Sequence, residues 1–117
     1  MTLPHGDLLL FAKNVAACTE EYVVVDCVFP SLPTLAMFLE AAAQCTAGFK
    51  TKKDVKIGFL TIGKEVKILE AIDSKAYQFK VYKDVQLAQY HQFYFEALCK
   101  ESKIKVVTGS FTLQIEE

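Results

Sequence analysis

Glu40 is the single carboxylate in the most apolar stretch of the chain, FPSLPTLAMFLEAAAQCTAGF, residues 29–49. An ionised carboxylate in an apolar interior is costly unless it is paired or solvated. Gln44 follows four residues later, so the two side chains share one edge of any helix formed here. Such a polar stripe is either the solvent-facing seam of a core helix or a general acid or base in an apolar tunnel. The spacing alone leaves both interpretations open.

The element that must position these residues is a helix, predicted to run from Pro33 or Thr34 to about Gly48. Proline and threonine suit the first positions of a helix, the alanines at 41–43 favour its interior, and glycine favours its end. Unpaired backbone N–H groups at residues 34–37 could receive a carbonyl oxygen or an oxyanion. A donor end followed by an acid one to two turns later suits a thioester substrate.

The rest of the chain has mostly the alternating pattern of β-strands. The predicted strands cover residues 8–19, 21–29, 55–69, 76–85, 90–99 and 103–117, with Gly63 as a bulge or bend. A helix that is apolar nearly all round must be covered on most sides. We therefore predict an α+β hotdog fold, in which a curved antiparallel sheet of about six strands wraps around one long central helix, as a single domain over residues 1–117. Its exposed sheet edges predict a two-fold dimer.

Charge excludes some classes of partner. The formal net charge is -1, and the cations are all lysine, so the bidentate contacts that arginine makes with phosphate or guanine are missing. We expect neither nucleic acid nor a membrane as a partner. Residues 50–105 carry twelve lysines against seven acids, a net +5. This block is either ordinary solubilising lysine or a docking face for an acidic partner.

The cysteines at 18, 27, 45 and 99 are scattered, without a CxxC pair or nearby histidines. We therefore expect no metal site and read the cysteines as reduced, mostly buried residues. In the absence of a leader-like segment they predict a cytoplasmic location. The apolar run from Leu32 to Phe49 has Glu40 and Gln44 at its centre and is short for a membrane span.

Three blocks resemble a known family. LPHGDLLLF (residues 3–11) looks like the opening of the hotdog 3-hydroxyacyl-(acyl-carrier-protein) dehydratases. FPSLP followed by EAAAQCTAG resembles their loop and central helix, and FLTIGKEVKI (residues 59–68) resembles the strand after it. The shortened loop looks still closer to the dehydratase-like proteins encoded with aryl-polyene lipid biosynthesis. The resemblance covers about the first 70 residues.

The resemblance implies functional roles for several residues of this chain, but the family's catalytic histidine has no counterpart here. Glu40 matches the family's catalytic acid, Gln44 matches the glutamine after it, and Pro33 and Thr34 roughly match the helix start that polarises the thioester carbonyl. The family's catalytic histidine does not carry over, because that place is Val28. Among the histidines of this chain, His5 is the better candidate base, because it lies in a matching block, and His91 is the alternative.

Three hypotheses follow from this comparison. The first is a dehydratase of 3-hydroxyacyl thioesters, with Glu40 as acid and His5 or a partner residue as base. The second is an acyl thioesterase, and the third is a non-catalytic subunit that binds an acyl carrier. Each implies a homodimer, or a heterodimer with a dehydratase homologue, and an acyl chain on the phosphopantetheine of an acyl carrier protein, with no other cofactor. Tunnels at the subunit interface would be lined by Met37, Phe29 and Phe59.

Overall fold

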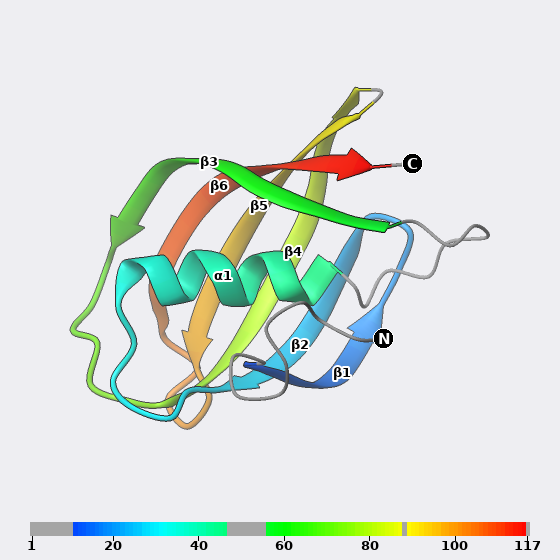
Figure 1. Ribbon diagram of the computed structural model, residues 1–117. Helices are drawn as coiled ribbons and strands as arrows, with labels where there is room; N and C mark the ends of the chain where they lie inside the picture. The colour runs from blue at the N-terminus through cyan, green and yellow to red at the C-terminus, as the bar shows by residue number, and fades with distance from the viewer. Residues whose placement is uncertain (1–10, 47–55, 88, 117) are drawn as a thin grey trace.

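Six strands and one helix follow one another along the chain in the computed structural model, which describes the backbone of residues 11–46, 56–87 and 89–116 (Figure 1). In chain order they are β1 (Ala12–Cys18), β2 (Tyr22–Val28), α1 (Leu35–Cys45), β3 (Lys56–Ile68), β4 (Ala76–Leu87), β5 (Tyr90–Cys99) and β6 (Lys105–Glu116). The predicted order of elements is therefore confirmed, with the helix between the second and third strands.

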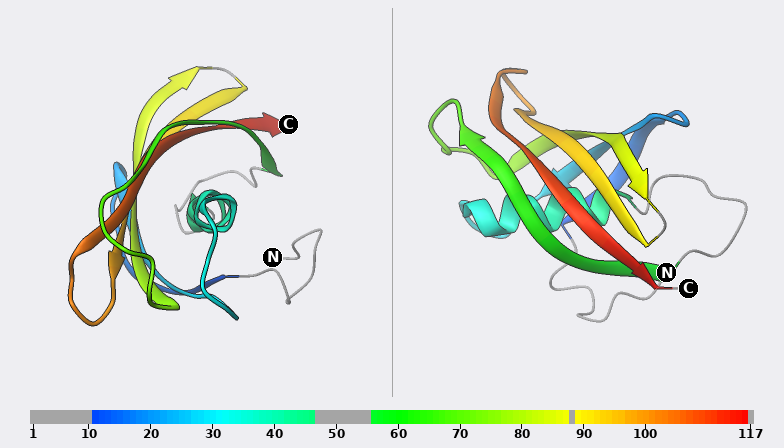
Figure 2. Two further views of the ribbon diagram at one scale, coloured as in Figure 1. Left: turned by 90° about the vertical axis from the view of Figure 1, so that its left-hand side faces the viewer. Right: turned by 90° about the horizontal axis from the view of Figure 1, so that it is seen from above.

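The strands form one sheet in the order β1-β2-β4-β5-β6-β3, and every neighbouring pair is antiparallel. Seen along α1, this sheet curves around the helix from β1 on one side to β3 on the other (Figure 2). The edge strands are thus the first and third of the chain, and the described strands leave one side of the helix uncovered. Across the described ranges, no helix has the length and apolar character that a membrane crossing requires.

Helix α1 begins where the sequence predicts and ends earlier. Thr34 is its N-cap, and the Thr34 hydroxyl accepts a hydrogen bond from the Met37 N–H at 3.2 Å. The helix covers only 11 residues, so the predicted long helix reaching Gly48 is wrong. At its end the Thr46 hydroxyl donates to the carbonyl oxygen of Ala43 at 2.6 Å, and such a back-bond competes with the regular helical pattern. Gly48 itself lies outside the described residues.

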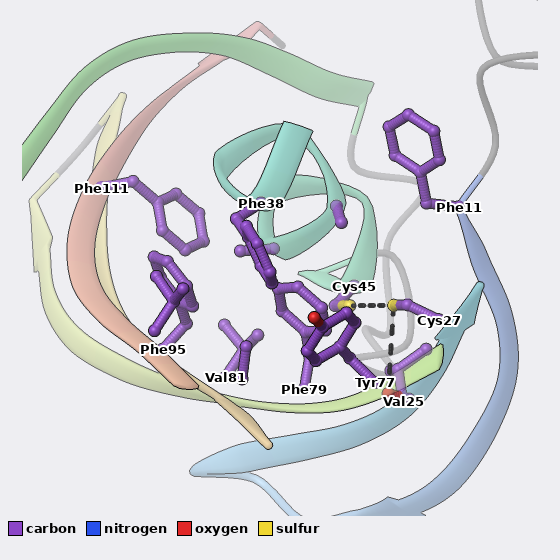
Figure 3. Packing of buried hydrophobic residues seen from close by; sticks show 14 of the residues in the cluster. Phe11, Val25, Cys27, Phe38, Cys45, Tyr77, Phe79, Val81, Phe95 and Phe111 are labelled. Atoms are coloured by element: carbon purple, nitrogen blue, oxygen red, sulfur yellow. Dashed lines mark hydrogen bonds between the residues drawn. The ribbon is translucent and has the colours of Figure 1, made fainter. Parts of the chain in front are cut away.

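The sheet-facing side of α1 is built from a helical repeat of apolar residues, Phe38, Ala41, Ala42 and Cys45. The Phe38 ring lies 5.1 Å from the ring of Tyr77 and 5.8 Å from that of Phe79, measured between centroids. The small alanines beside it are fully buried, which brings the helix close to the strands. Figure 3 shows this packing from close by, with the labelled side chains between the helix and the curved sheet.

The strands supply the other half of the core through every second residue. Alternate residues of β4, β5 and β6 are buried. They are Tyr77, Phe79 and Val81 on β4, Phe93, Phe95 and Ala97 on β5, and Val107, Phe111 and Leu113 on β6. Cys99, at the end of the series on β5, is half-buried.

Two glycines permit close approaches to the sheet. The pairing of β3 with β6 runs regularly through Gly63 and shifts on either side of it, once across Glu65, whose φ is 52°. Of the predicted bulge or bend at Gly63, a bulge is therefore ruled out at that residue, because the register shifts lie beside it. The absence of a side chain there serves a close contact, since a Cβ would lie 2.8 Å from Leu39 Cδ1 of the helix. At Gly109 a Cβ would meet Val66 Cγ2 at 3.0 Å and the Val66 Cα at 3.2 Å.

We expect Gly109→Ala to cost about 1–3 kcal/mol of unfolding free energy, because its neighbours include backbone and buried ring atoms that cannot move aside. Gly63→Ala should cost less, because the atom it meets is the end of the flexible Leu39 side chain. Urea unfolding of both variants measures the difference. A double-mutant cycle with Leu39→Ala should show coupling to Gly63→Ala and none to Gly109→Ala; the reverse order of losses would contradict this account.

Candidate functional site

Glu40 lies in the middle of α1, on the side turned away from the buried repeat that faces the sheet. Its side chain is half-buried. No hydrogen bond or ion pair joins Glu40 to another residue that the structure describes. Leu39 and Ala43, its neighbours on the helix surface, are apolar and half-buried as well. Leu39 and Ala43 pack against the core, Leu39 beside Gly63 of β3. Glu40 is therefore an acid on the side of α1 opposite the buried repeat, between apolar residues that already have core contacts.

Asp26, by contrast, lies on the outer face of the sheet, where its carboxylate has hydrogen-bond and ion-pair partners. Its carboxylate oxygens accept from Gln78 Nε2 at 3.2 Å and from Asn14 Nδ2 at 3.4 Å, and Lys100 Nζ lies 3.6 Å away. Burial alone would raise the pKa of Asp26, but these hydrogen bonds and the lysine charge outweigh burial and lower it. The charged carboxylate of Asp26 is thus stabilised by residues of neighbouring strands and by Lys100, so it has a structural role.

Glu96, also on the outer face, is satisfied in the same way. The Tyr82 hydroxyl donates to Glu96 Oε1 at 3.0 Å, and Lys105 Nζ lies 2.6 Å from Glu96 Oε2. The side chain of Glu96 is only 13% exposed, so these contacts replace most of its water. Three half-buried carboxylates therefore occupy the described part of the molecule, two with structural partners and Glu40 without one there.

The start of α1 carries the second feature of the candidate site. The N–H groups of Leu35 and Ala36 precede the first bond of the helical ladder, so helix geometry supplies no acceptor for them. Both residues are exposed. Ala36 lies four residues before Glu40 and shares its edge of the helix. Of the N–H groups at residues 34–37, which the sequence predicts to be open, those of Thr34 and Met37 are engaged, with Met37 Sδ and Thr34 Oγ1. The N–H groups of Leu35 and Ala36 stay candidates for binding a carbonyl oxygen, and that role stays a prediction.

Gln44 holds the edge strand β1 to the helix. Its side-chain oxygen accepts from the backbone N–H of Phe11 at 2.7 Å and of Ala12 at 3.2 Å. The sequence indicated no such contact, because nothing in a separation of 33 residues marks Phe11 as a partner. The oxygen of Gln44 is thus already engaged by the fold, and a contact between Gln44 and substrate stays a prediction.

The other predicted site residues are dispersed. Phe29 is 1% exposed and packs against Phe11 with ring centroids 4.8 Å apart, so it belongs to the core. Pro33 is buried and Met37 half-buried at the start of the helix. His5 and the side chain of Phe59 lie outside the described residues, so the structure does not place them.

Two further positions bear on the missing base. Val28, at the end of β2, is 43% exposed and carries no titratable group. His91 lies at the β4–β5 hairpin, opposite Gln86 and Leu113, and not beside the start of α1 (Figure 1). The described residues contain no cluster of three or more histidine, cysteine or acidic side chains that could hold a metal ion.

Solved structures with the same architecture identify the fold. A chain of the dehydratase heterocomplex ApeI:P from Xenorhabdus doucetiae superposes with a TM-score of 0.76 at 15% identity, over 98% of this chain and 88% of that chain. The fold of this chain is the hotdog fold. A hypothetical thioesterase with coenzyme A from Streptococcus pneumoniae gives a TM-score of 0.65 at 14% identity, over 88% of this chain and 84% of that one.

A third hotdog structure, the sigma28-regulated virulence protein Cj0977 from Campylobacter jejuni, gives a TM-score of 0.67 at 12% identity, over 99% of this chain and 92% of that one. A scan against protein-family models and a search of curated proteins found no match. At these identities the similarity establishes the hotdog fold alone. It does not choose an activity.

Replacing Gln44 with leucine should release β1 from the helix. The change removes the acceptor of two N–H groups, and Phe11 is only 3% exposed, so we expect a loss of about 1–3 kcal/mol. Hydrogen exchange should accelerate at Phe11 and Ala12, and urea unfolding should give the loss. The exposed Gln89→Leu serves as the matched control; unchanged exchange at Phe11 would show that Gln44 does not anchor β1.

Asp26 should make the fold sensitive to acid. Because its folded pKa lies below the ordinary value of 3.8, its stabilisation is complete above that value and is lost as pH falls through the folded value. Asp26→Asn should therefore be less stable than the native chain at neutral pH, and the gap should close as pH falls below 3.8 and through the folded pKa of Asp26. Urea unfolding at several pH values measures the gap, with the exposed Asp73→Asn as control. A gap that stays constant with pH would contradict this assignment.

Proposed function

We propose that this hotdog chain is a subunit of an enzyme that acts on 3-hydroxyacyl thioesters, with Glu40 as the general acid of a dehydration. The carrying observation is the half-buried Glu40 carboxylate, unpartnered among the described residues, on the open face of α1. An acid in such a place can protonate a leaving hydroxyl group. The exposed N–H groups at the start of the helix would bind the thioester carbonyl oxygen.

A second chain completes this proposal in two ways. Dehydration also needs a base for the α-proton, and Val28 at the family's histidine position cannot supply one. A partner would also cover the side of α1 that carries Glu40 and the exposed Ala36. One structurally similar protein is a dehydratase heterocomplex, which supports a heterodimer with a histidine-bearing hotdog chain. A homodimer is the alternative, with His5 as the base.

The substrate would be an acyl chain on phosphopantetheine, presented by an acyl carrier protein, and the location cytoplasmic. An acidic carrier needs a basic surface. Lys100 and Lys105 are engaged with acids on the outer face, and Lys80 Nζ lies 4.4 Å from the ring centre of Tyr22. The exposed Lys64 and Lys67 lie instead on β3, which passes beside the helix. We infer that this part of the lysine block docks the carrier.

A thioesterase is the second candidate function, because a carboxylate on the helix can act as a nucleophile at a thioester carbonyl. The absence of an imidazole at Val28 and the similarity to a hypothetical thioesterase with coenzyme A both favour it. In that case Glu40 would activate water or attack the carbonyl. The third possibility, a carrier-binding subunit without chemistry, uses the same surface and predicts no turnover.

Glu40→Gln, which keeps the shape and removes the acid, tests the proposal. We expect the chain, mixed with a hotdog partner that carries the histidine, to hydrate an enoyl thioester. The loss of the ultraviolet absorbance of the enoyl thioester measures this reaction. The variant should lower the rate by about 10²–10⁴-fold. The exposed Glu20→Gln is the matched control and should leave the rate unchanged.

Two further readouts separate the alternatives. Release of free thiol from acyl-CoA, lost in Glu40→Gln, would replace the dehydratase with the thioesterase. Carrier binding that survives Glu40→Gln, without turnover of either kind, would leave only the non-catalytic subunit. Absence of turnover and of carrier binding, alone and with the partner, would overturn the acyl-thioester function altogether.

A further inference from the structure

Two buried thiols face each other between the helix and the sheet. Cys27 points inward from β2 and Cys45 inward from the last turn of α1, with exposures of 0% and 1%. Their sulfur atoms lie 3.6 Å apart, and Cys27 Sγ also lies 4.0 Å from the carbonyl oxygen of Val25. Figure 3 shows the two sulfurs meeting at the junction of β2 and α1. All four cysteines of the chain are thiols.

This pair is distinct from the candidate acyl site and from the other cysteines. Cys45 lies on the sheet-facing side of α1, whereas Glu40 lies on the open side. Cys18 and Cys99 are half-buried at the ends of β1 and β5, outside the core. The fold therefore brings together two thiols that are 18 residues apart in the sequence.

We propose that Cys27 and Cys45 form an oxidation site that closes to an intramolecular disulfide between β2 and α1. A disulfide needs the sulfurs at about 2.05 Å, so they must approach by roughly 1.5 Å, a distance that side-chain rotation can cover. The bond would close a ring of chain that contains the helix cap, all of α1 up to Cys45, and Glu40. Oxidation would thus fasten the helix to the sheet.

Hydrogen peroxide can serve as the oxidant. One thiolate attacks a peroxide oxygen, the O–O bond breaks, and a sulfenic acid and water form. The second thiolate then attacks the sulfenic sulfur, the S–S bond forms, and a second water leaves. The two sulfurs together lose two electrons, which the peroxide gains, and the two thiol protons leave in the waters.

Burial sets the rate of this reaction. Desolvation raises the pKa of the Cys45 thiol, and the adjacent Cys27 raises it further, so Cys45 is poorly reactive in the closed fold. Tyr77, the cross-strand neighbour of Cys27, is itself fully buried. Peroxide must therefore enter through local opening between α1 and β2, and the disulfide should form more slowly than oxidation of the half-buried Cys99.

Intact mass and peptide mapping after peroxide treatment of the native chain test the site. We expect a loss of two hydrogens and a peptide pair joined through Cys27 and Cys45. The joined protein should melt at a higher temperature than the reduced one, because a cross-link restrains the unfolded chain. Cys18→Ser with Cys99→Ser should keep both effects, and Cys45→Ala or Cys27→Ala should abolish them.

Oxidation of the urea-unfolded chain supplies the control for the pairing. Without the fold, closure favours the shorter loop between Cys18 and Cys27, so a Cys27–Cys45 product specific to the native chain would confirm the site. Free thiols at both positions after Cys99 has reacted would overturn the proposal, as would the same mixture of pairs from folded and unfolded chains. Cys45→Ser, which keeps a group of similar size, distinguishes loss of the cross-link from loss of packing.

Discussion

The burial of one face of α1 in the concave side of the sheet is the interaction on which the structure depends. Phe38 lies at its centre, against rings from β4, and removing such a ring typically costs about 3–5 kcal/mol. Ala41 and Ala42 let the helix approach the strands, Gly63 leaves room for Leu39 of the helix beside β3, and Gly109 leaves room for Val66 of β3 beside β6. The helix is short, so its stability comes from this contact more than from its own hydrogen bonds.

Because the sheet buries one face of the helix, a polar residue of the helix must lie on the opposite face. Glu40 lies there by helical geometry, since it follows Phe38 by two residues, a turn of about 200°. Ala36, four residues before Glu40, lies on the same edge of the helix and is exposed. The candidate site is therefore a by-product of how the core is packed, and its remaining wall must come from outside the described strands.

The sheet itself divides its chemistry between two faces. Its inner face is aromatic and apolar, while the outer face collects the partnered acids Asp26 and Glu96 with their lysines. Register places these partners together: Asp26 lies opposite Gln78, and Tyr82 lies two pairs along the ladder from Glu96, on the same face of the sheet. Charged groups on the outer face thus stabilise strand pairing, which leaves Glu40 as the half-buried acid with no such task among the described residues.

The alternation of the strands, the cap at Thr34 and the apolar repeat of the helix are local signals, and the sequence by itself determined them. The order of elements followed from these signals, and the hotdog prediction followed from that order. The helix end was misjudged because the Thr46 hydroxyl competes with the helical bonds, a balance that propensity does not include. Only the tertiary structure decided the contact of Gln44 with Phe11, the role of Gly63 beside Leu39 and the meeting of Cys27 with Cys45. The physical reason is that these contacts join segments distant in the chain, and their distances depend on how the whole sheet curves around the helix.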